Sequence, residues 1–145
     1  MKKIILATLL FGFTMGASAQ YTYTLEDALI SSITVKEGKN TLLTKHGKGT
    51  LEFVKSGERF SNINFKDAQG RSHTLTAVPA NTPGLRKPDC TSATQLTCFV
   101  SKNKDIAVFI CKQDPLAGQP GTLTMTCATS NGADRYSIKN FKLGQ

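Results

Sequence analysis

The residues of this chain that could do chemistry are four cysteines and two histidines, set among ten carboxylates. Cysteines ligate metals as thiolates, whereas in an oxidising compartment they form disulfides. The cysteines contain no Cys-x-x-Cys pair, and neither His46 nor His73 is near a cysteine in the sequence, so the spacing argues against a zinc site. We therefore predict two disulfides and no bound metal or cofactor. The expected half-cystines are Cys90, Cys98, Cys111 and Cys127.

The sequence predicts that these cysteines are oxidised but does not determine which of them pair. Four cysteines allow three connectivities, and spacing does not choose among them. The preferred pairing joins neighbours in the sequence, Cys90 with Cys98 and Cys111 with Cys127. Cys127 also alternates with Leu123 along an apolar strand face, so we expect its side chain to be buried.

Catalytic motifs are missing from the sequence. It contains no Gly-x-Ser-x-Gly, His-Glu-x-x-His, Walker phosphate loop or Gly-x-Gly-x-x-Gly. His46 lies in a glycine-rich turn and His73 alternates with Leu75 along a strand, which favours a turn residue and a half-buried sheet residue over catalytic bases. We predict no catalytic residue and favour a binding protein. Because a fold can assemble a catalytic triad from distant residues, a small secreted enzyme that acts on the cell envelope stays the alternative.

A short motif lies near the C-terminus, where residues 130–136 read Ser-Asn-Gly-Ala-Asp-Arg-Tyr and residues 142–144 read Lys-Leu-Gly. The stretch resembles the C-terminal loop of bacterial periplasmic lysozyme inhibitors, in which a Ser-Gly-x-x-Tyr loop and a nearby lysine enter the lysozyme cleft. Asn131 replaces the motif serine, and Asp134 is an additional residue before the tyrosine. An ordinary Asn-Gly hairpin turn is the alternative interpretation. The resemblance implies these binding residues: Ser130, Asn131, Gly132, Arg135, Tyr136 and Lys142.

The elements that position these residues are short β-rich segments separated by turns that contain Gly and Asn. Their spacing is typical of a small antiparallel β-sandwich or barrel, so we predict one all-β domain over residues 20–145. Residues 106–111 are apolar on both faces and predict a central, buried strand. Residues 25–33 allow a short helix capped by Thr24, and three prolines between Val78 and Cys90 predict a loop. The main expected strands are 41–45, 50–55, 60–66, 71–78, 95–101, 106–112, 121–129 and 135–143.

Residues 1–19 have the features of a secretory signal peptide. Lys2 and Lys3 precede an apolar run over residues 4–13, and Ala-Ser-Ala at 17–19 is a small-residue cleavage site. The run is about half of the ~20 residues that a membrane-spanning helix needs, and no second long apolar stretch follows. We therefore expect a periplasmic or secreted protein without a membrane span.

The charge of the chain is strongly basic. It has 18 Lys and Arg against 10 Asp and Glu, a formal net charge of +8, and removal of Lys2 and Lys3 would leave +6. A basic protein favours encounter with anionic partners. Basic pairs recur in the expected turns: Lys36 and Lys39, Lys45 and Lys48, Arg86 and Lys87, Lys102 and Lys104.

The positions of the aromatic residues indicate which class of partner to expect. Nucleic-acid binding needs exposed aromatic side chains among the charges, but Phe53, Phe65 and Phe109 lie on apolar strand faces. We therefore predict a protein partner: an exported binding protein that neutralises or inhibits a lysozyme-like or other cell-wall hydrolase, or a rival's toxin in the manner of an immunity protein. A polyanion or ligand carrier is a third class. The sequence indicates neither the identity of the partner nor the oligomeric state.

Overall fold

The computed structural model describes residues 20–26, 28–88, 90, 95–113 and 121–139. The expected signal peptide at residues 1–19 and the expected binding residue Lys142 lie outside this part of the chain. Within it no helix is long and apolar enough to cross a membrane. The strands are β1 (Leu29–Ile33), β2 (Gly38–Thr44), β3 (Gly49–Ser56), β4 (Arg59–Lys66), β5 (Ser72–Val78), β6 (Gln95–Ser101), β7 (Ile106–Gln113), β8 (Thr122–Thr129) and β9 (Gly132–Ile138).

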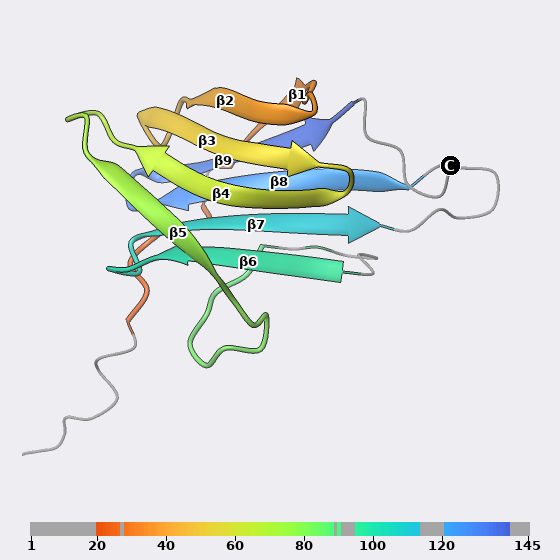
Figure 1. Cartoon of the computed structure of the whole chain (residues 1–145). Coiled ribbons are helices and arrows are strands. Elements are labelled where there is room, and N and C mark those ends of the chain that lie inside the picture. Colours follow the sequence, from red (N-terminus) through yellow and green to blue (C-terminus); the bar gives the residue numbers. More distant parts are fainter. Residues whose placement is uncertain (1–19, 27, 89, 91–94, 114–120, 140–145) are drawn as a thin grey trace, which may run out of the picture.

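These strands form one sheet in the order β1-β9-β8-β7-β6-β5-β4-β3-β2 (Figure 1). From β2 to β9 each strand pairs antiparallel with the next strand along the chain. β1 adds to the edge in parallel, with Leu29 opposite Asp134 and Ile33 opposite Ile138. The all-β prediction is confirmed, and the sheet is mixed rather than purely antiparallel.

Strand β5 folds the sheet over on itself. Its first half pairs with β4, where Thr74 lies opposite Asn64, and its second half pairs with β6, where Leu75 lies opposite Ser101. A strand that changes partners along its length forms a corner between packed layers. β5 accordingly runs diagonally in Figure 1, and the β2–β4 half stacks over the β6–β9 half as a curled half-barrel.

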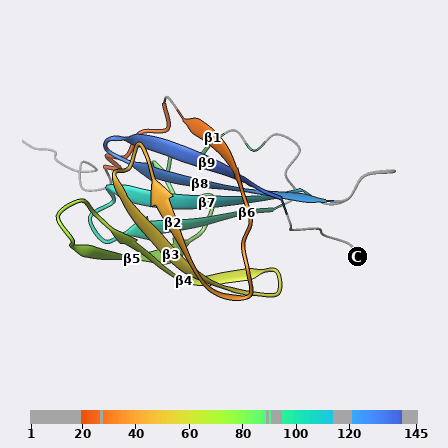
Figure 2. The same ribbon diagram turned by 90° about the horizontal axis from the view of Figure 1, so that it is seen from above.

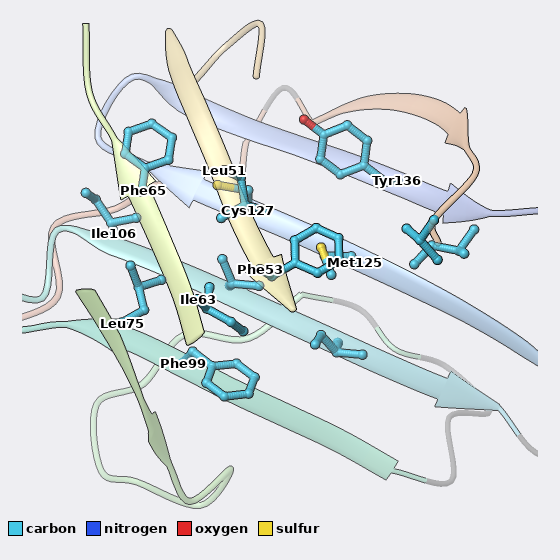
Figure 3. Packing of buried hydrophobic residues seen from close by; sticks show 14 of the residues in the cluster. Leu51, Phe53, Ile63, Phe65, Leu75, Phe99, Ile106, Met125, Cys127 and Tyr136 are labelled. Carbon is cyan, nitrogen blue, oxygen red and sulfur yellow. The ribbon is translucent and has the colours of Figure 1, made fainter. Parts of the chain in front are cut away.

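The inner face of the curled sheet encloses the main core (Figure 3). On β8, Leu123, Met125 and Cys127 are almost completely buried, as their alternation predicts. Burial of each large apolar side chain contributes about 1.5–3 kcal/mol to folding. The inner cluster consists of Val35, Leu51, Phe53, Ile63, Phe65, Leu75, Phe99, Ile106, Val108, Ile110, Leu123, Met125, Cys127, Tyr136 and Ile138.

The outer face of β6–β9 carries a second apolar cluster, covered by residues 20–26 and 28 and by residues 79–88 of the proline-containing loop between β5 and β6. Tyr23 and Leu85 from these two segments pack against Phe109 and Ala107 of β7. The residues of β7 from Ile106 to Ile110 are therefore buried on both faces, which confirms the prediction of a central strand.

The prediction of two disulfides is wrong, and so is the preferred pairing, because the structure joins Cys90 to Cys111 and leaves Cys98 and Cys127 as buried thiols. Cys98 and Cys111 lie on the outer face of the sheet, whereas Cys127 lies on the inner face. Cys111 and Cys127 cannot meet across the sheet. The disulfide instead ties the proline-containing loop to the outer face of β7.

The predicted helix over residues 25–33 is also wrong, since residues 29–33 form β1. The Thr24 hydroxyl accepts a hydrogen bond from the Glu26 N–H at 3.2 Å, so this residue caps a turn instead of a helix. Pairing with β9 draws the β-branched end of the segment into the sheet. Glycine-containing residues 38–40, expected in a turn, belong to β2.

Candidate functional site

Four β-turns gather at one end of the half-barrel, on the left in Figures 1 and 2. In an antiparallel meander alternate connections lie at the same end, so the β2–β3, β4–β5, β6–β7 and β8–β9 turns come together. We call this set of turns, residues 45–48, 67–71, 102–105 and 130–131, the turn end. It contains both histidine-bearing regions and the exposed residues Ser130 and Asn131.

A buried carboxylate holds the first of these turns. Asp134 on β9 is 3% exposed, and its side chain accepts hydrogen bonds from the backbone N–H groups of Lys45 at 3.1 Å, His46 at 3.2 Å and Gly47 at 3.1 Å. Three donors on one carboxylate compensate for the loss of its hydration. The β2–β3 turn is therefore fastened to the opposite edge of the half-barrel.

Two glycines allow this close approach. A side chain at Gly132, whose φ is +140°, would place its Cβ 2.9 Å from the Cβ of His46. A Cβ on Gly47 would lie 2.8 Å from the Thr44 hydroxyl oxygen. Because glycine has no side chain, the chain can pack this closely at both positions. His46 therefore packs directly against the β8–β9 turn.

The second turn is organised by Asp67. Its Oδ1 accepts the N–H groups of Gln69 and Arg71, and its Oδ2 lies 2.9 Å from Nε2 of His73 and 3.0 Å from Nε of Arg71. The bond to His73, followed by those to Arg71, holds the pKa of the Asp67 carboxyl well below its usual range. The Gly70 N–H also bonds to the Asp67 carbonyl, which closes a four-residue turn.

The third turn is closed by Ser101, whose hydroxyl donates to Asp105 at 2.8 Å and accepts the Ile106 N–H. The N-terminal segment is fastened beside it, through the Thr22 N–H to the Lys104 carbonyl and the Thr24 N–H to the Thr129 carbonyl. Among the described residues, no buried side-chain nitrogen or oxygen lacks a hydrogen-bond partner. The turn end is thus a preformed surface in which the polar groups of the turns bond to one another.

Two small recesses open on this surface and share His73. One, of about 150 Å³, lies between Asp67, His73 and the Ser130-Asn131 turn. The other, of about 260 Å³, lies between His73 and the Lys102-Asn103 turn. Arg71 lines the first recess and Lys102 lines the second. Asp67 and Asp105 also line the first recess, but both bond within their own turns. The cations of these turns and of the strand ends next to them are Lys45, Lys48, Lys66, Arg71, Lys102 and Lys104.

The residues of the C-terminal motif do not all reach this surface. Ser130 and Asn131 are exposed on it, but Gly132 is buried within β9. Tyr136 is 5% exposed in the inner core, where its hydroxyl donates to the Leu43 carbonyl at 3.3 Å. Arg135 lies on the outer face and donates from Nε to the Thr126 hydroxyl at 3.3 Å. Among the described residues of the motif, Ser130 and Asn131 are the ones exposed at the turn end.

No family model, curated protein or solved structure matches this chain.

Chemically, the turn end is equipped to bind anions. Within the described ranges, no three or more His, Cys, Asp and Glu side chains lie close enough to hold a metal ion. His73 is oriented by Asp67, as a base would be, but the described residues include no hydroxyl bonded to its other ring nitrogen. Lysine ammonium groups, the Ser130 hydroxyl and the Asn131 amide can donate to carboxylates.

The sequence interpretation missed the two carboxylates that build this site. Asp134 enters that interpretation only as an additional residue in a motif, and Asp67 has no part in it. One local signal was available for Asp134, since it alternates with Tyr136 and Ile138 on an apolar strand face. An acidic residue at a core-facing position needs hydrogen-bond donors, and a glycine-containing turn with free N–H groups supplies them.

Proposed function

We propose that this chain is an exported binding protein that docks its turn end on an acidic surface of another protein and neutralises it. The observation that carries the proposal is the convergence of four hydrogen-bonded turns whose exposed charged side chains are all cations. Rigid turns on a sheet suit binding because little conformational entropy is lost on association. The cations supply both attraction and orientation during encounter.

A hydrolase that cleaves cell-wall polysaccharide is the partner class we infer. The clefts of glycosidases carry a pair of catalytic carboxylates, which a protruding basic surface complements. Ser130 and Asn131 project between the cationic turns and would donate hydrogen bonds within such a cleft. The resemblance of residues 130–136 to the loop of lysozyme inhibitors supports the same class.

Export is part of this proposal. The leader-like residues 1–19 and the disulfide between Cys90 and Cys111 both support a periplasmic or secreted location, because structural disulfides persist in oxidising compartments. Cell-wall hydrolases act in the same compartments, so the proposed protein and its partner would meet there.

The test is inhibition of a panel of lysozyme-type hydrolases by the mature chain, measured as clearing of peptidoglycan at low and moderate salt. The triple variant Lys45→Glu, Lys48→Glu, Lys102→Glu should weaken inhibition about tenfold or more, because it reverses charge only at the turn end. Raising the salt concentration should weaken wild-type inhibition in the same direction, since exposed charges are screened.

A matched triple variant, Lys36→Glu, Lys39→Glu, Lys87→Glu, has the same net charge but leaves the turn end intact. It should inhibit nearly as well as wild type. Equal losses in the two triple variants would mean that net charge and not this surface drives binding. Failure of the wild-type chain to inhibit any panel member would reject the hydrolase class.

A further inference from the structure

A cavity of about 340 Å³ opens at the opposite end of the half-barrel, between the β3–β4 hairpin and the inner faces of β6, β7 and β8. We call it the mouth pocket. Its apolar walls are Phe60, Phe99, Ile110 and Leu123. The volume lies at the lower end of the range of about 300–1,000 Å³ typical of small-molecule sites, and the mouth of a curled sheet is a common place for one.

The floor of the mouth pocket is continuous with the inner core. Phe99, Ile110 and Leu123 are 9%, 5% and 1% exposed and belong to the inner cluster. Their remaining exposed atoms face the cavity, so a ligand tail placed there would extend the core of the protein. Apolar contact of this kind is favourable because it removes hydrocarbon from water on both sides.

A β-bulge brings Phe60 to the pocket. Ile63 and Phe65 of β4 point into the core, and strict alternation would send Phe60 to the opposite face. The pairing of β3 with β4 shifts between Glu52 and Val54, and Asn62 adopts a φ of +51° at the same place. One extra residue reverses the alternation, so Phe60 packs beside Phe53 with ring centroids 5.5 Å apart.

The rim of the mouth pocket carries charge. Lys112 Nζ lies 3.2 Å from a carboxylate oxygen of Glu58, and the Lys112 side chain is only 23% exposed. Arg59 lies on the same rim. Among the described residues that line the pocket, Lys112 and Arg59 are cationic and Glu58 is acidic, and a guanidinium matches the shape of a carboxylate.

We propose that the mouth pocket binds a small amphipathic anion with one unbranched alkyl tail and one monoanionic head, such as a medium-chain carboxylate. The tail lies on Phe60, Phe99 and Leu123, and the head bonds to Lys112 and Arg59 in place of Glu58. The site is at the opposite end from the turn end and does not depend on the function proposed for that surface.

The experiment is calorimetric titration of the mature chain with octanoate, octanol and octylammonium. Octanoate should bind more tightly than both comparison ligands, because only its head complements the rim. Lys112→Gln should weaken octanoate binding about tenfold, and Glu58→Gln should strengthen it by removing the competing carboxylate. Thr97→Phe, which fills the cavity from β6, should abolish binding. The control Lys139→Gln removes an exposed lysine outside the pocket and should bind as wild type does.

Amide chemical-shift mapping on the wild-type chain keeps the proposal testable even if Thr97→Phe fails to fold. Octanoate should shift the amides of Phe60, Phe99 and Leu123 and leave those of the turn end unchanged. Shifts confined to the turn end, octanol binding as tightly as octanoate, or no saturable binding of octanoate would each overturn the proposal.

Discussion

Asp134 is the residue on which closure of the half-barrel depends. Its carboxylate joins β9, near one edge of the sheet, to the turn that follows β2 at the other edge. Tyr136, two residues further on, adds a second link through its hydroxyl to the Leu43 carbonyl. Sheet hydrogen bonds do not connect β1 with β2 in the strand order, so these side chains supply polar links between the two edges.

We predict that Asp134→Ala lowers the free energy of unfolding by roughly 2–4 kcal/mol, because three backbone N–H groups lose their acceptor in a buried site. The measurement is urea denaturation. Ser137→Ala, at an exposed position of the same strand, is the matched control and should change stability by less than about 0.5 kcal/mol. If Asp134→Ala lowers the free energy of unfolding no more than the control does, the β2–β3 turn does not depend on the Asp134 carboxylate.

At the scale of elements, the outer layer is a separate unit of packing. The N-terminal segment and the β5–β6 loop contact each other through Tyr23 and Arg86: the Tyr23 hydroxyl donates to the Arg86 carbonyl, and the Arg86 guanidinium donates to the Tyr23 carbonyl and lies over the Tyr23 ring. The disulfide from Cys90 to Cys111 fixes the same loop to β7. Hydrophobic burial, hydrogen bonds and one covalent bond therefore hold this layer on the sheet.

Removing the disulfide should loosen this layer before the rest of the protein. We predict that Cys90→Ala, Cys111→Ala lowers the free energy of unfolding by roughly 2–4 kcal/mol, mainly because the unfolded chain gains freedom. Hydrogen exchange should increase over residues 79–88 and 20–26 while β3 and β4 keep their protection. Uniform loss of protection across the sheet would contradict the assignment of the loop as a separate unit.

The thiol content of the wild-type chain provides the control for that experiment. The oxidised protein should be lighter than the reduced chain by two hydrogens and should expose two reactive thiols only after denaturation, because Cys98 and Cys127 are both fully buried. Burial also raises the pKa of both thiols, which lowers their reactivity further. If no cysteine of the denatured protein reacted with a thiol reagent, all four cysteines would be in disulfides and the assignment of two free thiols would be wrong.

At the scale of the whole molecule, each face of the sheet buries one tyrosine. Burial raises the pKa of Tyr23 to about 12 on the outer face and raises the pKa of Tyr136 on the inner face. In the unfolded chain a tyrosine ionises near pH 10. Above that pH the unfolded state has lost protons that the folded state still holds, so stability must decrease as pH rises.

We therefore predict that the urea midpoint of the wild-type chain begins to fall at about pH 8.5, where the unfolded Cys98 and Cys127 thiols ionise, and falls more steeply between about pH 10 and 12, where unfolded tyrosines ionise. Tyr23→Phe, Tyr136→Phe should be less stable at pH 8, since each hydroxyl hydrogen bond contributes about 1 kcal/mol, but should show a flatter alkaline decline. The same slope in wild type and variant would mean that other groups govern the alkaline transition.

By itself, the sequence determined most of the strands, because alternation with period two depends only on neighbouring residues. It predicted β3 to β8 nearly residue by residue and the double-sided burial of β7. The same local pattern indicated that Leu123 and Cys127 face the core. Net charge and basic turns likewise follow from composition and order, and they already favoured an anionic partner.

Only the tertiary structure decided which of these local features meet. Cysteine pairing depends on which sheet face each thiol occupies and on which segment packs against that face. Here the proline-containing loop brings Cys90 to Cys111 on the outer face of β7. The parallel addition of β1 to β9, the corner in β5 and the capture of the β2–β3 turn by Asp134 are long-range contacts of the same kind. They also bury Tyr136 of the expected binding loop and leave Ser130 and Asn131 exposed, because the strand begins at Gly132. Local periodicity assigns a residue to a face, but only the curled sheet determines what lies opposite that face.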